Sequence, residues 1–222
     1  LRGLYAEERR VPDVVRYILV IERGQPSRLL LISRKQSNLI HGEKFIDIRV
    51  TDRIQRHRRV VLVIESPHKG EYDAHFDPIA PAQDETGEKI SDELCALVDR
   101  HRWLGLPDGS YELVISNPVQ FQASLHAVHG EPLYKNSPAQ ALRDKTWRAL
   151  YYDMNEQADF LRRLSSYDAA AVVVACTAKL KREVFQDVHQ WSQGRIPVLL
   201  ASEHPCVWNE RTTLVQAGGG RP

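Results

Sequence analysis

The sequence predicts an α/β protein with a three-layer α/β/α fold: helices cover both faces of a central, mostly parallel sheet of four strands, and an N-terminal β-hairpin is added to it. Four short apolar runs, at 60–64, 113–115, 170–175 and 198–201, lack the polar alternation of half-exposed strands. Such runs are typical of strands buried on both faces of a parallel sheet. Segments with helical spacing separate the runs, and this alternation indicates a doubly wound domain.

Each of the four runs ends in polar, chemically capable residues. The first run leads into Glu65 and Ser66, the second into Asn117, the third into Thr177 and the fourth into His204. In a parallel sheet the carboxyl ends of the strands frame the ligand crevice. We therefore expect these residues, which lie far apart in the sequence, to share one pocket.

Apolar segments at 14–21 and 28–33 flank a turn that contains Gly24 and Pro26, and they predict the hairpin. We expect residues 1–58 to form an N-terminal extension that packs on a main domain at 59–216. The glycine-rich stretch at 217–222 predicts a flexible tail.

Apolar residues at helical spacing predict a helix over 88–102, and the stretch 139–165 is typical of a helix in one or two pieces. A third helix is expected over 179–191, with Thr177 as its N-cap. The long loop 66–85 lies between the first run and the first helix. A loop of this length inside a compact domain is more often functional than incidental.

Composition narrows the classes of function. The net charge is +1, so contacts with nucleic acid require local clustering of basic residues rather than a basic chain. Three scattered cysteines form no C-x-x-C pair, which argues against a zinc site and a disulfide framework. We expect no metal, because His68 and His75 alone are a weak pattern. With no apolar run of transmembrane length and no signal-peptide pattern, we expect a cytoplasmic protein without a membrane partner.

The strand ends, taken in order, resemble the uracil-DNA glycosylase superfamily over roughly residues 59–213. The first motif runs from Ile64 to Tyr72, the second is Ser116-Asn117-Pro118, and the last begins at His204-Pro205. The resemblance implies a monofunctional DNA glycosylase, which hydrolyses the N-glycosidic bond of a flipped-out base and leaves an abasic site, in DNA repair or in defence against phage DNA. It also implies DNA as the partner, single- or double-stranded, and we expect a monomer.

The first motif carries the carboxylates that the resemblance assigns to catalysis. Glu65-Ser66-Pro67 is similar to the Glu-Ala-Pro of the thermophile-type branch, whose four-cysteine iron–sulfur cluster three cysteines cannot hold; we therefore expect no cluster and no cofactor. The classical branch has an Asp at the position of Ser66, which leaves the general base open among Glu65, Glu71 and Asp73. Glu65 is the first choice because it lies directly at the strand end.

The resemblance assigns the remaining roles by position. His204 donates a hydrogen bond to the oxygen of the departing base, and Asn117 reads the base edge with its amide. Trp208 is expected to insert into the duplex as a wedge, with a buried core residue as the competing interpretation. The other base-binding residues expected are Ser66, Pro67, His68, Phe76 and Gln120. The other DNA-binding residues expected are Lys69, Pro205, Asn209, Thr177 and Lys179.

The position of His68 bears on which base is removed. The classical enzymes carry a Tyr there that excludes a substituent at C5 of the pyrimidine, and His68 is smaller and polar. We therefore expect a modified pyrimidine, such as a hypermodified phage base. Two alternatives stay open: a non-catalytic nucleic-acid or nucleotide-binding protein of the same fold, and a hydrolase of free nucleosides or nucleotides.

Overall fold

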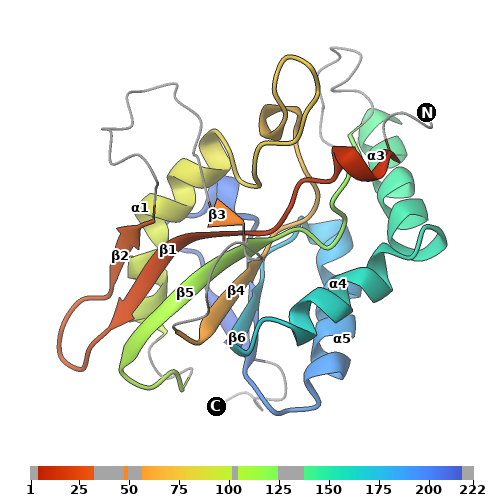
Figure 1. Ribbon diagram of the computed structural model, residues 1–222. Helices are drawn as coiled ribbons and strands as arrows, with labels where there is room; N and C mark the ends of the chain where they lie inside the picture. The colour runs from red at the N-terminus through yellow and green to blue at the C-terminus, as the bar shows by residue number, and fades with distance from the viewer. Residues whose placement is uncertain (1–4, 33–47, 50–56, 102–104, 125–137, 217–222) are drawn as a thin grey trace.

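The protein was analysed as a computed structural model, which describes residues 5–32, 48–49, 57–101, 105–124 and 138–216 (Figure 1). The predicted tail at 217–222 lies outside the described residues. Within them, no helix combines the length and the apolar character needed to cross a membrane.

One mixed sheet forms the centre of the molecule. Its path runs through seven strands, in the order β2 (Arg28–Leu31), β1 (Val14–Ile21), β5 (Gly109–Ser116), β4 (Arg59–Val63), β6 (Ala169–Val174), β7 (Val198–Ala201) and β8 (Leu214–Gln216). The short β3 (Ile48–Arg49) also pairs with β1. Strands β5, β4, β6 and β7 are mutually parallel, whereas β1 and β8 are antiparallel to their neighbours β5 and β7.

The predicted four-stranded sheet is therefore too narrow, although its four strands form the parallel centre. Val61 of β4 lies between Val114 of β5 and Val172 of β6, which fixes the register there. The expected hairpin of β1 and β2 exists, but β1 pairs along its length with β5 and so extends the same sheet. Strand β8 has only three residues and gives no periodic signal.

The helices follow the predicted segments closely. They are α1 (Glu85–Arg100), α3 (Pro138–Arg148), α4 (Glu156–Ser165) and α5 (Ala178–Ser192), with the π-helical segment η6 (Ala149–Asp153) after α3. Short 3-10 turns are η2 (Glu7–Arg9), η4 (Lys69–Glu71) and η7 (Pro205–Val207). The stretch predicted as helix over 139–165 is interrupted at Asn155, which has a left-handed φ of 66°. Asparagine tolerates this conformation better than most residues, so it separates α4 from η6.

Helices cover both faces of the sheet and give the predicted three layers (Figure 1). Helix α1 packs its buried Ile90, Leu94 and Leu97 on one face. Helices α3, α4 and α5 cover the other face, where Trp147 and Phe160 are fully buried. Side chains of a strand alternate between faces, so Val60 and Leu62 of β4 meet the first core, and Val61 and Val63 meet the second. The apolar run of β4 is therefore unbroken because the strand is buried on both faces of the sheet, as predicted.

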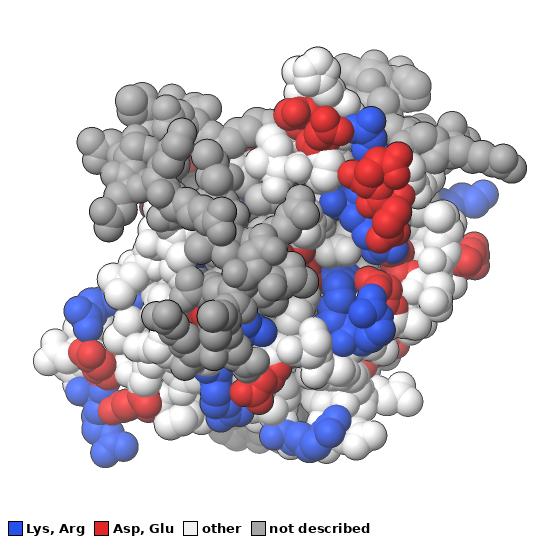
Figure 2. All heavy atoms as spheres, viewed as in Figure 1, with Lys and Arg blue, Asp and Glu red and all other residues white. Residues whose placement is uncertain are grey.

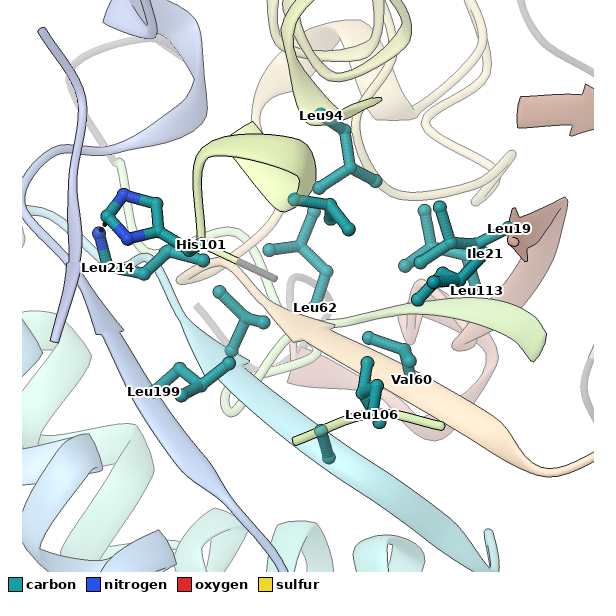
Figure 3. Close-up of a pocket in the computed structure, with 13 residues that line it drawn as sticks. Leu19, Ile21, Val60, Leu62, Leu94, His101, Leu106, Leu113, Leu199 and Leu214 are labelled. Carbon is teal, nitrogen blue, oxygen red and sulfur yellow. Dashed lines mark hydrogen bonds between the residues drawn. The ribbon is translucent and has the colours of Figure 1, made fainter. Parts of the chain in front are cut away.

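A small apolar cavity of about 40 Å³ remains between α1 and the sheet (Figure 3). Leu62, Leu94 and Leu199 point into it, and His101 lies at its edge, where its Nε2 accepts a hydrogen bond from the Leu214 N–H at 3.2 Å. Apart from His101 its lining is apolar, and apolar cavities of this kind stay dry. We treat it as a packing gap of the first core.

Asp13, just before β1, fixes the carboxyl end of β5. Its Oδ2 accepts hydrogen bonds from Ser116 Oγ (2.8 Å), Tyr167 OH (2.6 Å) and the Arg163 guanidinium. Its Oδ1 accepts from the Asn117 backbone N–H at 3.3 Å. The opposing charge of Asp13 raises the pKa of Arg163, although burial works against that shift. This charge cluster ties the N-terminal segment to the main sheet.

We expect Asp13→Asn to lower the free energy of unfolding by about 1.5–3 kcal/mol, because the buried Arg163 loses one of its two ion pairs and keeps only the pair with Asp159 at 2.8 Å. Chemical denaturation at pH 7 measures the change. Asp77→Asn is the matched control: Asp77 pairs with Arg9 at 2.6 Å on the exposed surface, so its loss should change stability by less than about 1 kcal/mol. Equal effects of the two substitutions would contradict this assignment.

Candidate active site

A polar cavity of about 500 Å³ opens at the carboxyl ends of β4 and β6. The chain leaves β4 toward β5 on one side and β6 toward β7 on the other, so this is the point where the strand order reverses. Ligands of doubly wound sheets bind at such a point. The lining residues are Glu65, Ser66, Pro67, His68, Glu71, Gln83, Asp84, Glu85, Thr86, Ser124, Gln140, Arg143, Thr177, His204 and Cys206.

Glu65 is the carboxylate at the floor of this cavity, and it is only 5% exposed. Its Oε2 accepts hydrogen bonds from the Thr177 N–H at 3.0 Å and from the Thr177 hydroxyl, and its Oε1 lies 3.1 Å from Arg143 Nη1. Burial raises the pKa of Glu65, while Arg143 and the two Thr177 donors oppose that rise. Because every partner is a donor or a cation, the arrangement suits the ionised carboxylate.

His204 faces the same cavity from the turn after β7. Its Nδ1 accepts the backbone N–H of Cys206 at 3.3 Å, so the proton of the neutral ring lies on Nε2. Burial, with the charges of Arg143 and Lys181, lowers the pKa of His204 to about 4. At neutral pH this side chain is therefore an uncharged hydrogen-bond donor.

Lys181 of α5 holds the turn that carries His204. Its Nζ donates to the backbone oxygens of Ala201 (2.9 Å) and Ser202 (2.6 Å), which are the last carbonyls of β7 and its turn. Burial lowers the pKa of Lys181. A cation fixed on these carbonyls keeps the turn, and with it the His204 ring, in one position.

Sequence reasoning missed Arg143, which lies at the centre of the site. Arg143 is 7% exposed on α3 and contacts Glu65, the Asp144 carboxylate and Thr177 Oγ1. An Arg-Asp pair within a helix usually indicates a solvated surface, and α3 follows no strand directly. The sequence therefore carries no local signal for its role.

Glu71 is the second carboxylate of the wall, and it is 4% exposed. Its Oε1 accepts the Ala82 N–H at 2.7 Å, whereas its Oε2 has no hydrogen-bond partner among the described residues. Burial raises the pKa of Glu71 to about 8, against the opposing effects of the Ala82 N–H and Arg16. Glu71 is therefore mostly protonated at neutral pH.

Asn117 and Gln120, expected to read the base, do not line the cavity. Asn117 is fully buried behind Glu65, where its Oδ1 accepts the Glu65 N–H at 3.3 Å. The Gln120 amide donates to Asp13 at 3.1 Å, and its backbone N–H donates to Glu156. Both residues hold the chain after β5 in place.

Asp73 and Phe76 also lie away from the cavity wall. Asp73 is exposed, and its Oδ1 accepts the backbone N–H groups of His75 (2.8 Å) and Asp77 (2.9 Å). The Phe76 ring stacks on Tyr72 with centroids 4.3 Å apart. These contacts shape the loop that carries Glu71.

Of the residues expected to contact DNA, only one lines the cavity. Thr177 lines the cavity, Lys69 and Asn209 are exposed, and Lys179 is about half exposed, with Nζ 3.6 Å from Asp144. Pro205 is buried as the first residue of η7.

The expected wedge, Trp208, is part of the first core: it is 1% exposed, and its Nε1 donates to the Glu203 carbonyl at 3.0 Å. A side chain so placed cannot enter a duplex, which matches the competing interpretation of a core residue. The neighbouring Val207 is 52% exposed.

The described residues include no cluster of His, Cys, Asp or Glu arranged to hold a metal ion. Cys95, Cys176 and Cys206 are free thiols. Burial raises the pKa of both Cys176 and Cys206, so neither is an activated nucleophile.

Comparisons with protein-family models, with curated proteins and with solved structures find no match. The function is therefore inferred from the cavity itself. Its most distinctive feature is an ion-paired Glu65 beside two titratable side chains, Glu71 and His204, that are both uncharged near pH 7.

We expect Glu71→Gln to weaken the pH dependence of stability. The pKa of Glu71 in the folded protein, about 8, lies above its ordinary value of 4.5, so the folded state holds this proton more tightly. The tighter proton binding stabilises the folded state fully below about pH 4.5, and this stabilisation is lost as the pH rises toward 8. The free energy of unfolding should fall on the order of a few kcal/mol over this range. Denaturation of wild type and variant at pH 5, 6, 7 and 8 measures the difference.

Glu88→Gln, which removes an exposed carboxylate from α1, is the control and should follow the wild type across this range. If Glu71→Gln also follows the wild type, the buried, protonated state of Glu71 is contradicted.

Proposed function

We propose that this protein is a DNA glycosylase that hydrolyses the N-glycosidic bond of a flipped-out, modified pyrimidine and leaves an abasic site. The observation that carries the proposal is that the Glu65 carboxylate and the neutral His204 ring line one polar cavity at the switch point of the sheet. Its volume of about 500 Å³ falls in the range of small-molecule sites and leaves room for a base with a substituent.

His204 supplies what the leaving base needs. Cleavage of the bond places negative charge on the base, and a fixed donor at its oxygen stabilises the transition state more than the substrate. The ring is neutral above pH 4, and the Cys206 N–H occupies Nδ1, so Nε2–H is the donating group. A neutral donor needs no proton from solvent to act at physiological pH.

Glu65 acts on the sugar side of the reaction. The sugar develops positive charge as the bond breaks, and an ionised carboxylate stabilises it or orients the attacking water. Each carboxylate oxygen accepts two hydrogen bonds, so Oε1 keeps capacity for a water beside its Arg143 contact. Arg143 and Thr177 thus keep Glu65 ionised without blocking it.

His68 supports a modified base. It is exposed at the cavity wall, and its Nδ1 accepts the Gly70 N–H at 3.4 Å, which turns the ring toward its own loop. The wall at this point therefore leaves space for a substituent on the pyrimidine ring.

A hydrolase of free nucleosides is the second candidate, favoured by the charge of the cavity. Its described lining carries three carboxylates, on Glu65, Asp84 and Glu85, besides the mostly protonated Glu71, and Arg143 is its only Lys or Arg. Arg143 is already paired with Glu65 and Asp144. On the described part of the face in Figure 2, acidic and basic side chains stand side by side. A nucleoside needs no phosphate contact, whereas a DNA-acting enzyme must find such contacts at the cavity mouth.

We expect abasic sites when the protein is incubated with DNA that contains 5-hydroxymethylated or glucosylated pyrimidines, and none in unmodified DNA. Glu65→Gln and His204→Ala should each reduce base release at least about 100-fold, because each removes one charge-stabilising group. Glu88→Gln and His189→Ala, on exposed helix surfaces, are the matched controls and should keep wild-type rates.

Release confined to uracil-containing DNA would overturn the modified-base assignment. Binding of every DNA in the panel without release would favour a non-catalytic binding protein, and release from free nucleosides alone would favour the second candidate. Added salt should slow the wild type on duplex DNA, because phosphate contacts release counterions.

We expect Val207→Ser to reduce release from duplex DNA about tenfold and to leave release from single-stranded DNA unchanged. Val207 is 52% exposed and directly follows Cys206, which lines the cavity; an exposed apolar side chain can hold open the gap left by a flipped nucleotide. Val215→Ser, at a 58% exposed valine on β8, is the control. Equal loss on both DNA forms would contradict the role of Val207.

A further inference from the structure

Two buried polar side chains of the cavity wall carry atoms without hydrogen-bond partners among the described residues. Gln83 is 4% exposed, and neither its Oε1 nor its Nε2 has a hydrogen-bond partner among the described residues. Glu71, also 4% exposed, has the same property at Oε2. Both residues line the cavity. Buried polar atoms are nearly always paired, and leaving one unpaired destabilises the fold, so this cluster requires an explanation.

The backbone around Gln83 is held in place from outside the loop. Ala82 and Asp84, on either side of Gln83, have left-handed φ values of 54° and 58°. Arg16 of β1, which is fully buried, donates to the carbonyls of Pro81 (2.5 Å) and Ala82 (2.6 Å). Strained backbone of this kind persists where the surrounding structure fixes it and is concentrated at ligand sites.

The same contacts determine which hydrogen-bonding groups of these two side chains are left for a ligand. The Ala82 N–H occupies Oε1 of Glu71, so the carboxyl proton lies on Oε2. With the pKa of Glu71 at about 8, this O–H is present at neutral pH. The wall therefore offers two donors, Glu71 Oε2–H and Gln83 Nε2–H, and one acceptor, Gln83 Oε1.

We propose that Gln83 and Glu71 are the specificity residues of the cavity and that they read a neutral edge with two acceptors and one donor. The proposal rests on the proposed function, since it assigns this edge to the base that is removed. Pyrimidine edges have this composition: uracil offers two carbonyls and one N–H, and cytosine offers O2, N3 and an amino N–H. Guanine has the reverse count, with one acceptor and two donors. The pair replaces Asn117, which lies behind the wall.

Binding of free bases that carry a methyl group in place of the sugar tests the roles of Gln83 and Glu71 without any reaction. The probes are 1-methyluracil, 1-methylcytosine, 9-methylguanine and 1,3-dimethyluracil, in which a methyl group blocks the donor of the edge. The dissociation constants are measured by NMR titration of the full chain. We expect 1-methyluracil or 1-methylcytosine, or both, to bind at least tenfold more tightly than 9-methylguanine and 1,3-dimethyluracil. Gln83→Met should erase this preference, whereas Glu71→Gln, which keeps a donor at this position, should retain it within about threefold.

Gln122→Met is the matched control. Gln122 is also a buried glutamine with an unpartnered amide oxygen, but it does not line the cavity, so its loss should leave the preference intact. Gln83→Met should also shift the denaturation midpoint upward, because it removes unpaired polar atoms from the interior. A purely structural Gln83 would shift it downward.

Equal binding of all four probes to the wild type, no binding of any probe, or a preference that survives in Gln83→Met would each overturn the proposal. A test of the proposed function, base release from DNA, gives a separate result. A preference for the intact edge without base release from DNA overturns the proposed function and leaves the specificity pair standing. If the protein releases bases from DNA and Gln83→Met does not slow that release, the proposed function stands and the specificity pair is overturned.

Discussion

The Glu65 carboxylate is the contact on which the geometry of the site depends. It joins the end of β4 to the start of α5 through Thr177 and to α3 through Arg143. Its backbone extends the junction, since its carbonyl accepts Trp147 Nε1 at 3.2 Å. A buried charge is tolerated only when it is paired and hydrogen-bonded, so these elements cannot separate without a large penalty. The floor of the cavity is therefore rigid for the same reason that it is charged.

Around this ion pair, burial moves two other groups in opposite directions. The pKa of Glu71 rises to about 8 and that of His204 falls to about 4, and both shifts favour the uncharged form. Environments that separate pKa values in this way commonly distinguish the roles of an active site. Between these two values the cavity combines one fixed carboxylate with two neutral donors. A reaction that develops positive charge on a sugar and negative charge on its leaving group makes use of both kinds of group.

The sequence was informative where a single rule decides the outcome. Unbroken apolar runs predicted the parallel strands, and the shared direction of those strands predicted that Glu65, Thr177 and His204 would meet. The rule does not say which way a side chain turns after its strand ends, so Asn117 was expected at the cavity and lies behind its wall, and Trp208 was expected as a wedge and lies in the core. Arg143 and Gln83 were missed because a helix and a strained loop bring them to the site. Their positions follow from tertiary packing, which has no local sequence pattern.

The N-terminal segment, which the family resemblance does not cover, determines part of the cavity wall. Arg16 fixes the Pro81 and Ala82 carbonyls, and the N–H of Ala82 in turn fixes Glu71. The wall at 81–84 would otherwise have to hold left-handed residues with no outside support. Asp13 similarly neutralises Arg163 at the end of β5. A chain with the same four motifs but a different N-terminal segment would therefore keep the ion-paired floor and present a different wall. In this fold the floor is fixed by contacts within the main domain, whereas part of the wall is fixed by Arg16 of the N-terminal segment.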